Sequence, residues 1–533
     1  MGKLERAAAA LRILGRAGVL RPERPDRLLG ALLALRRYGV SLAGAYAIQA
    51  ARQPDGPAVI DHLGAITFAN MDATTTAVAG GLRRLGIRDT DRVGVLARNH
   101  RGFVESTVAL AKLGVDTLYL NTGFAGPQMA GVLQREGATA LIVDGEFADL
   151  TALLPSQWPC VYSSAAEPPR SPTLAELAAG GSDRALPPPR RGARQILLTS
   201  GTTGTPKGTL RDAPATIDPL LAIVSMIPLR SSDITLIAAP MFHTWGLAHL
   251  ALGMALGATL VLRPRFEPET ALRLIEEHGV TVLAAVPVML QRLLDAAGSA
   301  TRRYDTSSLR IVAVSGSALP GDLAVRFMDR FGDVLYNLYG STEVAWASIA
   351  TPADLRAAPG TAGRPPPGTE VRLLGDDDRT VGPQGRGRIF VGNSMLFSGY
   401  TDRATKAVVD GLMETGDTGY FDADGRLFVE GRDDDMIVSG GENVFPREVE
   451  DLLAAHPAVL ECAVVGVADD EFGQRLEAFV VRRPGHDVDA DELQTYVRDR
   501  LARYKVPREV VFVPTLPRNA TGKVVKADLP GRH

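Results

Sequence analysis

The stretch LLTSGTTGTPKGTLR, residues 197–211, decides the fold class, and its centre is SGTTGTPKG at Ser200–Gly208. It follows an apolar strand pattern at residues 195–198, which is where a βα unit places its ligand-binding loop. The three glycines of the centre can adopt positive φ and turn backbone N–H groups toward an anion. Four hydroxyl side chains and the ammonium group of Lys207 add further donors. The stretch therefore predicts a phosphate-binding loop in an α/β fold.

This loop differs from the phosphate loop of P-loop NTPases, which needs Gly-Lys-Ser/Thr at the start of a helix. Lys207 instead stands between Pro206 and Gly208, so the chain does not enter a helix in that way. Five donor-bearing side chains among nine residues are also more than a purely structural glycine turn requires. We therefore expect phosphate chemistry of another class.

The composition describes a soluble chain of more than one domain. Its 533 residues exceed the size at which one hydrophobic core stops growing, and 45% hydrophobic with 22% charged residues is ordinary for a globular protein. A formal net charge of −3 gives no indication of a nucleic-acid partner. The two cysteines, Cys160 and Cys462, lie far apart, which predicts a reducing, cytoplasmic location with neither a disulfide framework nor a zinc site.

Short β-branched runs alternate with helical patterns along most of the chain, which predicts an α/β fold with largely parallel sheets. The expected buried strands are RVGVLA (92–97), ALIVD (140–144), QILLTS (195–200), TVLAAVP (281–287) and LRIVAVSG (309–316). Residues 234–262 contain no Asp, Glu, Lys or Arg. Pro240 and several glycines nevertheless divide them into strand, helix and strand, so we expect a buried α/β segment rather than a membrane span.

Three parts are expected along the chain. Residues 1–48 form a basic amphipathic arm, residues 49–431 a large domain of parallel α/β layers, and residues 432–533 a small α+β domain joined by a hinge. The small domain is expected to contain strands near CAVVGVA (462–468) and EAFVVRR (477–483) and helices near PREVEDLLAAH (446–456) and DELQTYVRDRLA (491–502). The stretch PPPRRGARQ (187–195) is interpreted as a surface linker between two lobes.

The N-terminal arm permits two interpretations. Residues 1–40 hold nine basic side chains against three acidic ones, with leucines at roughly helical spacing. Arg12 and Arg16 interrupt any apolar core long enough for a signal peptide. The arm is then either a solvated helical extension or a basic amphipathic surface for peripheral contact with the inner face of the cell membrane.

Three further motifs accompany the opening loop. They are NLYGSTE (337–343), TGDTGYFDADGRLFVEGRDDDMIVSGGENVFPREVE (415–450) and LPRNATGKV (516–524). In this order and spacing, the four motifs resemble those of the adenylate-forming superfamily, which includes acyl-CoA synthetases, aryl-CoA ligases, firefly luciferase and peptide-synthetase adenylation domains. The resemblance covers roughly residues 50–530. It implies that a carboxylate attacks the α-phosphate of ATP, in the presence of Mg²⁺, and that a thiol, usually that of coenzyme A, then displaces AMP.

The resemblance assigns the ATP phosphates and magnesium to two motifs. The residues that it implies for the phosphates are Thr199, Ser200, Gly201, Thr202, Thr203, Gly204 and Lys207. Glu343 and Thr202 are implied as the magnesium site, with Thr342 beside the α-phosphate. Magnesium prefers oxygen ligands and neutralises charge as pyrophosphate leaves.

The nucleoside is assigned to residues of three stretches. The residues implied for the adenine ring are Tyr339, Gly340, Ser317 and Ala318. Asp417 would accept both ribose hydroxyls, as a carboxylate with two oxygens can, and Arg432 would lie beside it.

The C-terminal motifs imply a small domain that rotates between the two half-reactions. Asp434 occupies the position that resembles the family's hinge. Lys523 resembles the lysine whose ammonium bridges the substrate carboxylate and the α-phosphate. Ser439, Gly440 and Gly441 lack bulk and would line the tunnel for the pantetheine arm of coenzyme A.

The acyl pocket is assigned to PMFHTWG, residues 240–246. His243 would lie near the junction of the adenylate and the thiol tunnel, Trp245 and Gly246 would line the acyl site, and Gly316 would lie behind it. No cation in the following apolar segment could pair with a second carboxylate, which favours a fatty or other apolar acyl group over an amino acid.

The sequence thus predicts an ATP-dependent fatty acyl-CoA synthetase for medium- to long-chain acids, most similar to bacterial fatty-acid–CoA ligases. Two alternatives stay open: an acyl-AMP ligase that loads a carrier protein, and an aryl-CoA ligase. A non-catalytic scaffold of the same fold would be expected to have lost Lys523 or Glu343, and both are present.

Overall fold

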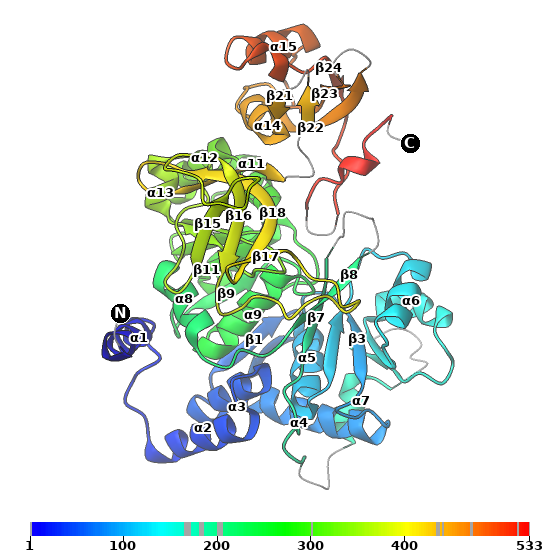
Figure 1. Cartoon of the computed structure of the whole chain (residues 1–533). Helices are drawn as coiled ribbons and strands as arrows, with labels where there is room; N and C mark the ends of the chain where they lie inside the picture. Colours follow the sequence, from blue (N-terminus) through cyan, green and yellow to red (C-terminus); the bar gives the residue numbers. More distant parts are fainter. Residues whose placement is uncertain are drawn as a thin grey trace.

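The chain forms a large part built on three sheets and a small C-terminal part built on a fourth (Figure 1). The computed structural model describes residues 3–164, 172–180, 186–199, 206–299, 302–432, 437–439, 442–469, 473–519 and 522–531. This arrangement confirms the predicted fold class of a large α/β part followed by a small α+β part.

The first sheet has six strands in the order β6-β5-β3-β4-β7-β8, all parallel except β8, which pairs antiparallel with β7. Its strands are β3 (Arg92–Leu96), β4 (Asp116–Tyr119), β5 (Ala140–Val143), β6 (Cys160–Tyr162), β7 (Gln195–Thr199) and β8 (Lys207–Arg211). The helices between them are α4 (Phe68–Arg84), α5 (Arg101–Leu113), α6 (Gly126–Arg135), the 3-10 helix η1 (Gly145–Leu153) and α7 (Leu174–Ala179). The strands of this sheet are near-continuously apolar, as predicted for strands that helices cover on both faces.

This sheet corrects one prediction. Residues 187–195 were expected to link two lobes, but β7 at their end pairs with β4 of the preceding chain. The proline-rich stretch is therefore a connection within one sheet. The prediction was wrong because prolines and arginines are as typical of a surface loop as of a linker.

The second sheet has eight strands in the order β14-β13-β12-β11-β9-β10-β1-β2, with antiparallel strands only at its edges. Its strands are β1 (Pro57–Asp61), β2 (Gly64–Thr67), β9 (Ile234–Ile237), β10 (Thr259–Leu262), β11 (Val282–Ala285), β12 (Ile311–Val314), β13 (Leu335–Tyr339) and β14 (Ser348–Ala350). The helices between them are α8 (Asp218–Met226), α9 (Thr244–Leu256), α10 (Pro268–His278), α11 (Pro287–Ser299), α12 (Gly321–Phe331) and α13 (Pro352–Ala357). The strand, helix and strand predicted for residues 234–262 are confirmed as β9, α9 and β10.

The third sheet is antiparallel, with β15-β16-β18-β17 in order and β19 also paired to β18. Its strands are β15 (Glu370–Leu374), β16 (Gly387–Gly392), β17 (Val408–Val409), β18 (Leu412–Phe421) and β19 (Leu427–Arg432). The β18–β19 hairpin carries two predicted site residues, Asp417 and Arg432, which pair across it.

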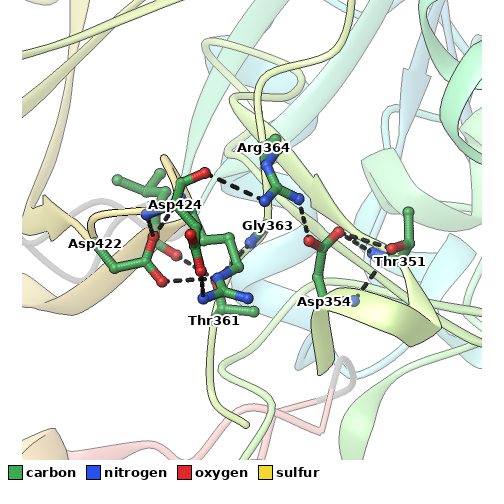
Figure 2. A network of polar contacts seen from close by, with 9 residues as sticks. Thr351, Asp354, Thr361, Gly363, Arg364, Asp422 and Asp424 are labelled. Carbon is green, nitrogen blue, oxygen red and sulfur yellow. Dashed lines mark hydrogen bonds and ion pairs between the residues drawn. The ribbon is translucent and has the colours of Figure 1, made fainter. Parts of the chain in front are cut away.

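A polar network anchors the turn of that hairpin to the second sheet (Figure 2). Arg364 donates to the carbonyl oxygen of Asp424 at 3.2 Å and forms an ion pair with Asp354. Asp354 also accepts from the hydroxyl of Thr351 at 2.7 Å, at the start of α13. The hydroxyl of Thr361 donates to the carbonyl of Leu427 at 2.9 Å. These contacts fix the turn of the hairpin, at the opposite end from Asp417 and Arg432.

The small part confirms the elements predicted for it. It contains β20 (Ile437–Ser439), β21 (Glu442–Val444), α14 (Pro446–Ala454), β22 (Val459–Asp469), β23 (Gly473–Arg482), α15 (Ala490–Arg498), η3 (Arg503–Lys505), β24 (Glu509–Phe512) and η4 (Lys526–Asp528). It has its own apolar core, formed by residues such as Val449, Leu453 and Val480. We retain the domain boundary at residue 432 as a proposal.

The chain begins with three helices, α1 (Lys3–Arg16), α2 (Pro25–Tyr38) and α3 (Leu42–Arg52). α3 is part of the main body, because Tyr46 and Gln49 are buried and Gln49 donates to the carbonyl of Ala255 in α9 at 3.0 Å. Within the described ranges, no helix is both long enough and apolar enough to span a membrane.

Candidate active site

A cavity of about 1600 Å³ lies where the large and small parts meet. It brings together residues from all four motifs and from the helix after β9. The predicted site residues that line it are Thr199, Lys207, His243, Ser317, Ala318, Tyr339, Gly340, Thr342, Glu343, Asp417, Arg432 and Lys523, together with Trp245, Gly246 and Gly316 of the expected acyl pocket.

Other predicted site residues are not placed at this cavity. Ser200, Gly201, Thr202, Thr203 and Gly204 of the loop, the hinge residue Asp434, and Gly440 and Gly441 lie outside the described residues. Ser439 is in β20, where it pairs with Glu442 and Gly473, and it is not among the described residues that line the cavity. Their roles stay predictions.

Asp417 and Tyr339 meet inside the cavity, from β18 and the end of β13. The phenol Oη of Tyr339 donates to Oδ2 of Asp417 at 2.6 Å. Burial raises the pKa of the Asp417 carboxyl, and the hydrogen bond from Tyr339 and the charge of Arg432 oppose that rise. Burial also raises the pKa of Tyr339, so the phenol keeps its proton and remains a donor. One carboxylate oxygen is thus held by the protein while the carboxyl faces the cavity, which suits a ligand with paired hydroxyls.

Glu343 follows β13 and is only 9% exposed. Tyr400 donates its phenol hydrogen to Oε1 of Glu343 at 2.8 Å. Arg211 of β8 is buried nearby and donates to the carbonyl of Thr342, and burial lowers the pKa of Arg211 to about 10, against the opposing effect of Glu343. The guanidinium therefore stays charged at neutral pH. A buried carboxylate with one oxygen fixed by a neutral phenol can offer the other to a cation.

The donor set fits a magnesium ion that is shared with phosphates. No cluster of three or more His, Cys, Asp or Glu side chains suited to a metal occurs in the part of the chain that the structure describes. Magnesium in phosphate-transfer sites is commonly bound by one or two carboxylates plus substrate phosphates rather than by an all-protein cage. Glu343 is the residue that would supply that carboxylate.

Replacing Tyr400 with Phe is expected to raise the magnesium concentration needed for half-maximal activity by about 10-fold or more, because Glu343 loses the hydrogen bond that orients it. A single hydrogen bond to a charged group is worth about 1.5–3 kcal/mol, or roughly 10- to 100-fold. Magnesium titration of initial rates measures the effect. Tyr420→Phe, on β18 and outside the cavity lining, is the matched control, and an unchanged magnesium requirement in Tyr400→Phe would contradict the orienting role.

His243 lies at the start of α9, in the wall of the cavity. Its Nε2 atom is buried and makes no hydrogen bond within the described residues. Burial lowers the pKa of His243 to about 4, so its imidazole is neutral at neutral pH. The hydroxyl of neighbouring Thr244 donates to that of Thr342 at 3.1 Å, which ties α9 to the motif that contains Glu343. A neutral imidazole with an unpaired nitrogen at this wall can donate to or accept from a bound substrate.

Buried histidines in α9 also predict a pH-dependent stability. Burial lowers the pKa of His249, as of His243, to about 4, below the ordinary value of about 6.5. The unfolded chain therefore binds protons that the folded chain excludes, and stability is lost as pH falls from about 6.5 toward 4. We expect His249→Leu to flatten this fall in melting temperature, measured by calorimetry between pH 7 and 5. Exposed His486→Leu is the control, and an unchanged slope in His249→Leu would contradict the assignment.

Lys523 is presented to the cavity by a tight loop of the small part. Asn519 organises the loop: its side chain accepts from the backbone N–H of Lys523 at 3.0 Å, and its own N–H donates to the carbonyl of Lys523 at 2.9 Å. Gly522 has φ +78°, and a Cβ there would lie 2.6 Å from Cγ1 of Val288 in α11. The loop therefore docks on the large part only with glycine at this position. The Lys523 ammonium is close enough to Asp417 to lower the pKa of that carboxyl.

Lys207 begins β8 at the other side of the phosphate loop. Its ammonium pairs with Asp402 at 3.2 Å and lies 5.7 Å from the centre of the Tyr400 ring. Both side chains are partly exposed, so the Lys207 ammonium can exchange Asp402 for a stronger anion. Tyr400, Asp402, Arg211 and Thr244 were not predicted from the sequence. Arg211 and Thr244 could have been, since they stand in the quoted stretches LLTSGTTGTPKGTLR and PMFHTWG.

Two family models match the chain. The model described as "AMP-binding enzyme" matches residues 46–401, and that described as "AMP-binding enzyme C-terminal domain" matches residues 448–523. The first alone covers more than half of the chain, and the second contains Lys523.

Relatives of known activity are similar along almost their whole length. A feruloyl-CoA synthase of an Amycolatopsis species is 35% identical over 91% of this chain and 98% of its own length. An indoleacetate–CoA ligase of Aromatoleum aromaticum is 34% identical over 87% of this chain and 92% of its own. Among solved structures, o-succinylbenzoate CoA synthetase from Bacillus subtilis, in complex with its acyl-adenylate intermediate, is similar with a TM-score of 0.80 and 29% identity, over 91% of this chain and 97% of that one.

Proposed function

The chain belongs to the AMP-binding enzyme family of adenylate-forming enzymes, and from that premise we propose that it joins an aromatic carboxylic acid to coenzyme A. The reaction is acid + ATP + coenzyme A → acyl-CoA + AMP + pyrophosphate. Its cofactors are ATP, Mg²⁺ and coenzyme A, as is general for CoA ligases of this family. The activity at this level, an AMP-forming acid–thiol ligase, is that of the relatives described above.

One observation carries this proposal: a single cavity is lined by Lys207, Glu343, Asp417 and Lys523. Asp417 is suited to the ribose hydroxyls and Lys207 to the phosphates that leave. Glu343 would hold Mg²⁺, which neutralises phosphate charge when bound. Lys523 would lie between the acid and the α-phosphate, where its charge stabilises the oxygens as the carboxylate attacks.

The expected fatty-acid substrate is not confirmed, and the aryl-CoA alternative has the better support. The two relatives described above are named for ferulic acid and indoleacetic acid, both aromatic. The structure adds a fixed aromatic surface at the cavity, since Trp245 donates its indole N–H to the carbonyl of Ala285 at 3.0 Å. An indole held in this way can pack against the ring of an aromatic acid.

A longer aliphatic acid is the second candidate, and the course of the cavity lining favours it. The volume of about 1600 Å³ is shared with ATP and coenzyme A, so what supports an aliphatic acid is where the apolar lining runs. The lining continues along α9 through Ala251 and Ala255 to Ala45 and Ile48 of α3. An apolar extension of this length would accommodate an acyl chain beyond what an aryl acid needs.

A panel of acids separates these candidates. The purified protein is given ATP, Mg²⁺ and coenzyme A with ferulate, indoleacetate, octanoate or palmitate, and acyl-CoA is quantified by mass spectrometry. We expect the aromatic acids to have the highest kcat/KM. A clear preference for palmitate would replace the proposal by the second candidate. Acyl-AMP that accumulates and does not respond to coenzyme A would instead indicate a ligase that loads a carrier protein.

A further inference from the structure

The helix α2 packs with its small residues inward and its leucines outward. The positions turned toward the protein are the less exposed ones, Arg27, Gly30, Ala31, Ala34 and Tyr38, which recur at helical spacing. A Cβ at Gly30 would lie 3.0 Å from the Cβ of Ala51, so the contact with α3 is close. The leucines, which could bury the most apolar area, are therefore left on the other face, and none of the residues of α2 is fully buried.

This outer face is large. Leu29, Leu32 and Leu33 are 59%, 63% and 57% exposed. Eight of the fourteen exposed large hydrophobic side chains among the described residues fall within residues 11–40, namely Leu11, Leu20, Leu28, Leu29, Leu32, Leu33, Leu35 and Val40. Scattered exposed leucines are ordinary, but a concentrated patch marks an interaction surface. Five of the eight, Leu28, Leu29, Leu32, Leu33 and Leu35, lie on α2, and we call these five residues the leucine face.

Exposed arginines accompany the leucine face. Arg36 lies in the last turn of α2 itself, and Arg12 and Arg16 lie one turn apart on the exposed side of α1. Arg21 and Arg24, between the two helices, pair locally with Glu23 and Asp26. The segment that presents the leucine face therefore carries excess positive charge.

We propose that the leucine face docks on the surface of a lipid bilayer that contains anionic lipids. Apolar side chains bordered by arginines are the pattern of a helix that lies in the membrane interface, with its apolar side in the acyl boundary and its cations at the headgroups. A second copy of the chain fits less well, because a self-complementary contact would bring the positively charged arginines of the two copies together.

The position of the leucine face in the molecule suits such docking. α1 and α2, in dark blue, lie at one side of the large part, far from the small C-terminal part in orange and red (Figure 1). The small part thus stays free to move when α2 is bound. Leu35 of the leucine face lines the cavity, as does Val40 just beyond α2, so the bound bilayer lies at one rim of that cavity. α1 is anchored to the protein through Ser231, whose N–H donates to the carbonyl of Ala17 at 2.8 Å.

Co-sedimentation of the full-length chain with sucrose-loaded vesicles tests the proposal. One set of vesicles contains phosphatidylcholine alone, and the other contains phosphatidylcholine with phosphatidylglycerol. We expect the wild type to bind the anionic vesicles, and Leu29→Ser, Leu32→Ser and Leu33→Ser together to lower its partition coefficient by about 100-fold. The matched control is Leu63→Ser with Leu153→Ser, two leucines that are exposed elsewhere on the surface.

Charge is tested separately. Replacing Arg12, Arg16 and Arg36 with Gln should weaken binding to anionic vesicles by about 100-fold and leave binding to neutral vesicles unchanged. Circular dichroism and ligase activity in solution confirm that each variant is folded. The proposal is overturned if the wild type ignores anionic vesicles or if the triple serine variant binds them as well as the wild type does. It is also overturned if light scattering shows a wild-type dimer that the serine variant dissociates, since a second copy would then cover the face.

Discussion

Lys523→Ala is expected to lower the rate of acyl-adenylate formation by at least about 100-fold, because removing one donor to the charge of the transition state typically costs 100- to 1000-fold. The loop that carries Lys523 is tied by Asn519 and docked on α11 through Gly522, so the structure around the lost side chain should persist. The second half-reaction, in which the thiol displaces AMP, is expected to survive largely intact. It uses another face of the small part, where SGGENVFP (439–446) is predicted to act.

Two assays separate the half-reactions. Acid-dependent exchange of pyrophosphate into ATP measures adenylation, and acyl-CoA formed from a supplied acyl-adenylate measures thioester formation. Lys505→Ala is the matched control, since Lys505 is also a lysine of the small part but pairs with Glu448 and does not line the cavity. Equal loss of both half-reactions in Lys523→Ala would exclude the assigned role.

Asp417→Ala is expected to raise the KM for ATP by at least about 100-fold, since hydrogen bonds from two ribose hydroxyls to a charged group are lost, each worth about 1.5–3 kcal/mol. The change also removes the acceptor for Tyr339, whose Oη would keep only Thr415, at 3.3 Å. Because burial raises the pKa of Asp417, the wild-type KM for ATP should itself increase as pH falls and the carboxylate gains a proton.

The matched control is Asp422→Asn. Asp422 lies beyond the end of β18 at the turn of the same hairpin, where its carboxylate accepts from Arg426 at 2.7 Å, outside the cavity lining (Figure 2). Its KM for ATP should match that of the wild type. A wild-type KM in Asp417→Ala would mean that the ribose is bound elsewhere.

The sequence predicts the elements of this fold well where its patterns are local. Apolar runs bounded by glycine or proline located β3, β5, β7, β11 and β12, and the uncharged segment of residues 234–262 was divided at Pro240 into strand, helix and strand. The same local patterns cannot show which strands pair. The stretch at residues 187–195 looked like a boundary because its composition is that of a linker, whereas the pairing of β7 with β4 joins residues 78 positions apart in the sequence.

The residues of the candidate site were also only partly predictable from the sequence. Lys207, Glu343, Asp417 and Lys523 could be predicted because each stands in a motif with a physical reason for its residue type. Tyr400 could not, since it contacts Glu343 from 57 residues further along the chain and no pattern marks a tyrosine as the donor to a distant carboxylate. The outward leucines of α2 were expected only under one of the two interpretations of the N-terminal arm, because helical periodicity gives a stripe but not the side on which it is buried.

The central claim is that this cavity forms an acyl-adenylate and passes the acyl group to coenzyme A. Mass spectrometry of the products formed from ferulate, ATP, Mg²⁺ and coenzyme A tests it most directly. We expect AMP, pyrophosphate and feruloyl-CoA in equal amounts, with no AMP when the acid is left out. ADP and phosphate as the products, or no acid-dependent consumption of ATP with any acid of the panel, would contradict it.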